Sequence, residues 1–206
     1  YYINNENYDK AVKSLVKFLR SKNDKKLKAR LNYILAQIYL EKKNYEKAKG
    51  ALKNTISSGI NKSDNLILWS KLIYNNLINS PDYNLFKKLI RSERYRQNIS
   101  LINYFNAKLI LNTDLKQAEH LFSNALLSNK IDITLKSKIY VELYKINMSK
   151  KDYLLASKYL DSSLLYLDSS TLKYFRLNRT KNKIKEVVRI EKENKILDSM
   201  IYVNSL

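Results

Sequence analysis

Apolar residues recur every three or four positions along most of this chain, which is the period of an α-helix with one buried face. The stretch LNYILAQIYLEKK (31–43) is representative, because Leu31, Ile34, Leu35 and Ile38 fall on a single helical stripe. Two glycines and one proline among 206 residues leave few turn residues for a β-rich fold, so we predict an all-α protein. The predicted helices are 7–20, 27–42, 45–58, 64–79, 83–92, 97–111, 114–128, 132–149, 152–167 and 171–193, with a short tail to 204.

One short pattern, an aromatic residue followed three positions later by alanine, recurs along the chain. It occurs as Tyr8/Ala11, Tyr45/Ala48 and Tyr153/Ala156, in a weaker form as Leu115/Ala118, and in a degenerate form as Tyr83/Phe86. The spacing of 32 to 38 residues resembles the unit of about 34 residues in tetratricopeptide (TPR) repeats. We therefore predict a TPR-like solenoid of helical hairpins over 1–168, with about four to five units. The repeat is degenerate over 60–95, and residues 169–206 are expected to form a C-terminal capping helix and tail.

The residues around each repeat indicate the structural role of the pattern. A small alanine lets a second helix approach closely, and a large apolar residue follows it by four positions on the same helical face. These large residues are Leu15, Leu52, Phe122 and Leu160. An Asn or Asp precedes each repeat, where its side chain can cap the helix N-terminus, at Asn7, Asn44, Asp82, Asp114 and Asp152.

Two surfaces are candidates for partner binding. A TPR array usually presents a concave groove, lined by the first helix of each unit, to a peptide or helix. In the second unit that groove would include Arg30, Tyr33, Gln37 and Leu40. The second candidate is the densest arginine cluster, Arg91, Arg94 and Arg96, which would suit an acidic partner or alternatively form a solvated connection between helices.

The charge of the chain favours acidic partners in general terms. The net charge is +20, from 39 basic and 19 acidic residues. A field of this sign attracts nucleic acid, anionic lipid or acidic protein surfaces. Only eight of the basic residues are arginine, and the composition rich in Lys, Asn, Ile and Tyr is typical of an AT-rich genome. We interpret most lysines as solvated and do not expect nucleic acid to be the partner.

The chain carries no recognisable catalytic chemistry. It has no cysteine, and its single histidine, His120, has no nucleophile motif beside it, so we interpret it as structural or surface-exposed. With two glycines, a backbone phosphate cradle is hard to build. The 17 tyrosines are interpreted mainly as packing residues, including Tyr45. We therefore expect neither an enzyme nor a cofactor. The chain begins with Tyr1, so we expect it to be a processed or partial product.

The segment 140–200 carries features beyond the repeat. A helix ends before "DY", and the pattern A-x-x-Y-x-D-S follows as Ala156, Tyr159, Asp161 and Ser162. An aromatic and basic helix surrounds Tyr174, Arg176 and Arg179, and a tail carries Val188, Glu191, Asp198 and Ser199. Upstream, a related pattern appears at Tyr33, Leu35, Ala36, Gln37 and Tyr39. Together these residues resemble the SprE/PorW family of TPR lipoproteins of Bacteroidetes, which serve gliding motility and type IX secretion.

The resemblance implies a non-catalytic scaffold that holds other proteins of the cell envelope together. It implies a location at the periplasmic face of the outer membrane, with membrane attachment only through a lipid anchor outside this chain. Three alternatives remain open: a generic TPR adaptor of another complex, a cytoplasmic location if the resemblance fails, and a basic helical-repeat protein that binds nucleic acid. Phosphate-driven binding would fall steeply with salt.

Overall fold

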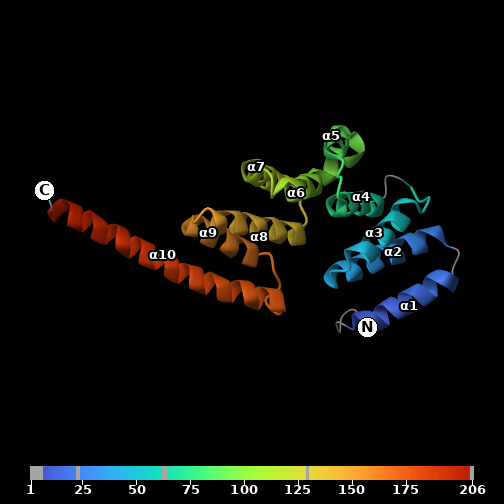
Figure 1. Ribbon diagram of the computed structural model, residues 1–206, viewed down its shortest axis with the longest axis horizontal. Coiled ribbons are helices and arrows are strands. Elements are labelled where there is room, and N and C mark those ends of the chain that lie inside the picture. The colour runs from blue at the N-terminus through green and yellow to red at the C-terminus, as the bar shows by residue number, and fades with distance from the viewer. Residues whose placement is uncertain (1–6, 22–23, 62–64, 129, 205–206) are drawn as a thin grey trace. The chain divides into compact units, whose positions relative to one another are not determined.

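The computed structural model describes residues 7–21, 24–61, 65–128 and 130–204, and this part of the chain contains helices and no strands (Figure 1). The all-α prediction is confirmed. The helices are α1 (Tyr8–Ser21), α2 (Lys25–Glu41), α3 (Tyr45–Ile56), α4 (Asn65–Leu77), α5 (Tyr83–Arg91), the 3-10 helix η1 (Glu93–Asn98), α6 (Ile99–Ile110), α7 (Leu115–Leu126), α8 (Ile133–Ser149), α9 (Tyr153–Leu164) and α10 (Leu172–Asn204).

The chain divides into two compact units, residues 1–94 and 95–206, which are described separately below as unit 1 and unit 2. The sequence predicted a different division, at 168, between a repeat array and a capping helix. Helix α10 belongs to unit 2 because its first half packs on α9. Ile184 is buried there, and Lys181 forms an ion pair with Asp161 of α9, with 2.5 Å between Nζ and Oδ1.

The helices pack mainly as neighbours in sequence. In unit 1, α2 packs along α3, and α3 also contacts α4. In unit 2, the closest pairs are α6 with α7 and α8 with α9 (Figure 1). These pairs correspond to the hairpins that the repeated pattern predicts.

The crossing alanines lie where the sequence predicted them. Ala48, Ala118 and Ala156 have no exposed surface, and Ala11 is 4% exposed. The large residues four positions later are also buried in three of the four cases: Leu52, Phe122 and Leu160. Tyr45 is different, because it is 51% exposed, so its assignment to a packing position was wrong. It is the first residue of α3.

Side-chain caps fix the starts of the helices, as predicted. The Asn44 side chain accepts a hydrogen bond from the backbone N–H of Lys47 at 3.2 Å, and Asp152 accepts one from Leu155 at 2.9 Å. Asp82 and Asp114 cap α5 and α7 in the same way. Each bond satisfies a backbone donor that the first turn of the helix leaves unpaired.

The turns α2–α3 and α8–α9 share one unusual backbone feature. Lys43 and Lys151 have positive φ values of 56° and 61°. In the first turn, the N–H of Asn44 bonds to Tyr39 O and that of Lys43 to Leu40 O, which is the Schellman pattern of a helix end. A residue other than glycine is strained in this left-handed conformation.

We expect Lys43→Gly to raise the free energy of unfolding of unit 1 by about 1 kcal/mol, since glycine relieves the strain. The chain's one tryptophan, Trp69, lies in unit 1, so its fluorescence during urea denaturation measures the effect. Lys43→Ala is the matched control, because it removes the same side chain and keeps the strain. Equal stability of the two variants would contradict the prediction.

Candidate functional site

The best candidate site in unit 1 is the surface formed by α2 and α4, which lie against each other. Tyr33 of α2 and Trp69 of α4 meet there, with ring centroids 6.1 Å apart and planes tilted by 42°. Trp69 keeps 38% of its surface exposed. Arg30 and Gln37 of α2 are exposed, and they lie three residues before and four residues after Tyr33, which places them next to it along the helix. We call the surface of these four residues the α2–α4 face.

The position of the α2–α4 face follows from the packing of the adjacent side of α2, which carries Ala29 and Ala36. Ala29 and Ala36 are fully buried, and their small side chains let α3 approach closely. The Thr55 hydroxyl of α3 lies 3.0 Å from the Ala51 carbonyl oxygen and 3.4 Å from that of Ala29, so its single hydrogen is shared between the two acceptors. Because this packing fixes the rotation of α2, Arg30 and Gln37 are turned towards solvent.

Within this face, Tyr33 has a supporting role. It is only 9% exposed, and burial raises the pKa of its hydroxyl, while a hydrogen bond with Gln37 acts in the opposite direction. The hydroxyl is therefore neutral at physiological pH. Its ring holds Trp69 in place, and a ring that is already packed contributes less new contact to a partner. Leu40, the fourth residue of the predicted groove, is half-buried.

The sequence reasoning missed Trp69. The available signal was that it is the chain's single tryptophan, in a segment already predicted to be helical. Its exposure depends on how α4 packs against α2 and α3, which the periodicity of one helix does not determine. Exposed tryptophan and arginine side chains are typical of interaction hot spots.

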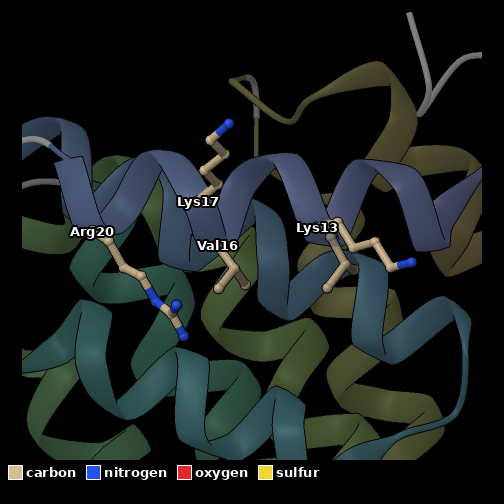
Figure 2. A pocket seen from close by; sticks show the side chains of 5 residues that line it. Lys13, Val16, Lys17 and Arg20 are labelled. Carbon is tan, nitrogen blue, oxygen red and sulfur yellow. The ribbon is translucent and has the colours of Figure 1, made fainter.

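Two hollows in unit 1 lie away from the α2–α4 face. The first is open and runs along one flank of α1, lined by Val12, Lys13, Val16, Lys17 and Arg20. Figure 2 shows Val16 and Arg20 pointing to the same side of α1, while Lys17 points to the other. The second hollow lies between α3 and the end of α4, with Lys49 and Tyr74 among its lining residues. All lining residues of the first hollow come from one helix, so it is a surface strip with a basic edge.

Unit 2 contains a buried carboxylate among lysines. The side chain of Glu142 in α8 is 10% exposed, and its Oε1 lies 3.2 Å from Lys108 Nζ of α6 and 3.3 Å from Lys145 Nζ of α8. Burial, with a further contribution from Glu142, raises the pKa of Tyr104. Partial burial and the charges of Lys138 and Lys145 lower the pKa of Lys173 at the start of α10. Glu142 therefore neutralises part of a dense basic cluster, which is a structural role.

The remaining predicted residues lie apart from these features. Arg91 and Arg94 are exposed residues of unit 1, and Arg96 is an exposed residue of unit 2. Because the division between the units falls inside η1, the three arginines are not treated as one site. His120 is exposed on α7, with its ring nitrogens 3.4 Å from Asn124 Nδ2.

The described residues contain no group of three or more His, Cys, Asp or Glu side chains placed to hold a metal ion. Within the same ranges, no helix has both the length and the apolar character needed to cross a bilayer. Comparison with protein-family models gives no matching family, and comparison with curated proteins gives no matching relative.

Proposed function

We propose that this chain is a non-catalytic scaffold that binds another protein through the α2–α4 face. The observation that carries the proposal is the exposed Trp69 packed against Tyr33, with the exposed Arg30 and Gln37 one turn to either side of Tyr33 on α2. Tryptophan and arginine supply much of the binding energy in known interfaces, especially where a neighbouring side chain holds them rigidly.

The repeat architecture that we propose for this scaffold is TPR-like. It is supported by the buried crossing alanines and by the adjacent helix pairs α2–α3, α6–α7 and α8–α9. It is also supported by the matching turns at Lys43 and Lys151, which lie in the same position before the second helix of their pairs. In such an array, α2 and α4 would be first helices of consecutive units, and the α2–α4 face would belong to the concave side.

The biological setting that we propose is the type IX secretion and gliding machinery of the cell envelope. This part rests on the resemblance of 140–200 to the SprE/PorW family, above all on Ala156, Tyr159, Asp161 and Ser162. The chain would work at the periplasmic face of the outer membrane, held there by a lipid anchor outside the 206 residues.

The proposal predicts that Trp69 is needed to capture the partner. A photo-reactive amino acid placed at position 30 of the protein in its native cells should cross-link a partner. Trp69→Ala should reduce the cross-linked product by about thirtyfold, because truncating a hot-spot tryptophan removes at least 2 kcal/mol of binding free energy. Mass spectrometry of the product identifies the partner.

Two controls separate the parts of this proposal. Tyr45→Ala removes an aromatic of α3 that is 51% exposed, against 38% for Trp69, and it should leave the cross-link unchanged. If cross-linking at position 30 does not depend on Trp69, the proposed face is wrong. A Trp69-dependent partner from a cytosolic complex would instead refute the secretion setting and keep the scaffold function.

A further inference from the structure

The second half of α10 extends beyond the packed part of unit 2. No side chain from Lys185 to Ile201 is buried, yet the helix continues to Asn204, about 30 Å beyond the buried Ile184 at the usual rise per residue. Figure 1 shows this half running past the ends of α8 and α9. The capping helix expected from the sequence therefore caps unit 2 only with its first half.

An exposed apolar seam follows this half of α10. Its members are spaced alternately by three and four residues, the heptad period of a coiled coil: Val187, Ile190, Asn194, Leu197 and Ile201. The four apolar members are exposed by 39%, 46%, 55% and 67% in that order. Exposed apolar residues that line up on one face are characteristic of an interaction site.

The seam is not the face that packs on α9. The packing face carries the buried Ile184 and the half-buried Val188. At about 100° per residue, the seam lies roughly a third of a turn away from it. Ile190 does not belong to the packing face, because its side chain is 46% exposed.

The charges beside the seam are sorted by sign. With Val187 and Asn194 at heptad position a, positions e and g are acidic at Glu186, Glu191, Glu193 and Asp198. The basic residues of the same stretch, Arg189, Lys192 and Lys195, lie at the outer positions b, c and f. Glu193 pairs within the helix with Arg189, at 3.5 Å between Oε1 and Nη1, and both side chains remain more than half exposed. The apolar seam is thus bordered by negative charge in a chain of net charge +20.

We propose that residues 187–201 form one strand of a parallel, two-stranded coiled coil with a helix of a partner protein. That helix carries Lys or Arg at its e and g positions and an asparagine opposite Asn194. An asparagine at one a position is the usual determinant of a two-stranded register, and residues at e and g determine partner choice. A second copy of this chain does not fit, because acidic residues would face acidic residues across the seam. The inference does not depend on the α2–α4 face.

A designed pair of helical peptides tests this surface. Both peptides repeat the seam of α10 at a and d, and they differ only in having Lys or Glu at e and g. Fluorescence anisotropy at pH 7 with the whole 206-residue chain should show saturable binding of the Lys peptide. The Glu peptide should bind at least about tenfold more weakly, because like charges across an interface are disfavoured. Added salt should narrow the difference between the peptides.

Variants of exposed residues complete the test, since they leave the packing of unit 2 intact. Leu197→Gln and Ile190→Gln should each weaken the binding of the Lys peptide by about tenfold, because each removes one apolar contact of the seam. Lys192→Gln, at the outer position f, should leave binding unchanged. Equal binding of the two peptides, or full binding to Leu197→Gln, would overturn the proposal. Leu197-dependent dimers of the chain alone, detected by sedimentation at pH 7, would overturn it in favour of a second copy.

Discussion

Phe122→Ala is expected to lower the free energy of unfolding of unit 2 by about 3–5 kcal/mol. Phe122 has no exposed surface and lies at the centre of the core that α6, α7 and α8 form. The same core contains the fully buried Ala107 and Ala118, and the ring centroid of Phe122 lies 5.8 Å from that of Tyr104. These small residues cannot expand into the vacated space, so most of the cavity remains. The loss in free energy of unfolding is therefore well above that expected for truncating a partly exposed side chain.

Urea denaturation followed by far-UV circular dichroism measures this loss, and amide hydrogen exchange locates it. Protection should fall in α6, α7 and α8, the helices that surround the ring. Leu127→Ala is the matched control, because Leu127 lies just after α7 and is 77% exposed. It should change the free energy by no more than about 0.5 kcal/mol. A loss below about 1 kcal/mol for Phe122→Ala would mean that this core is loosely packed.

The sequence predicted the helices well because their signals are local. Apolar period, a capping Asn or Asp, and a crossing alanine each involve residues within one or two turns. Asn44, Asp114 and Asp152 cap helices where the pattern indicated, and Ala48 and Ala156 are fully buried. These features depend little on the rest of the chain, which is why they could be predicted.

What the sequence did not predict depends on how helices are rotated and where their packing stops. Trp69 belongs to the candidate site because α4 packs against α2 and brings its ring to that of Tyr33. The change of face along α10 was missed because Ile184 and Ile190 both fit an apolar period, although the first is 4% and the second 46% exposed. A period shows that a helix has an apolar face and does not show whether that face is covered.

The two candidate surfaces differ in how many of their residues the sequence pattern indicated. Arg30 and Gln37 were predicted from the expected position of first helices, and both are exposed on α2, the helix whose Tyr33 meets Trp69. The seam of α10 emerges only when exposure and charge are considered together with the heptad period. Both surfaces suit proteins as partners. The proposed place of the chain in type IX secretion rests on the resemblance and stays a prediction.

The second large effect is expected at Glu142. Glu142→Gln should lower the free energy of unfolding of unit 2 by about 2–3 kcal/mol, since removing one partner of a mostly buried ion pair leaves the other charge uncompensated. The loss of this negative charge affects more than one lysine. Lys108 and Lys145 both lie within 3.3 Å of the carboxylate, and Lys108 is only 35% exposed. Lys173, whose pKa is already lowered by burial and by neighbouring lysines, would lose its nearby counter-charge.

A double-mutant cycle separates this electrostatic explanation from a simple loss of packing. Lys108→Met alone should cost less than Glu142→Gln, because Lys145 still neutralises the carboxylate in that variant. The double variant should recover about 1 kcal/mol or more relative to the sum of the single changes, since neither charge is then left without its partner. Glu142→Gln should also become less damaging in high salt, which screens the remaining lysines. Strict additivity of the two changes would refute an electrostatic pairing of Glu142 with Lys108.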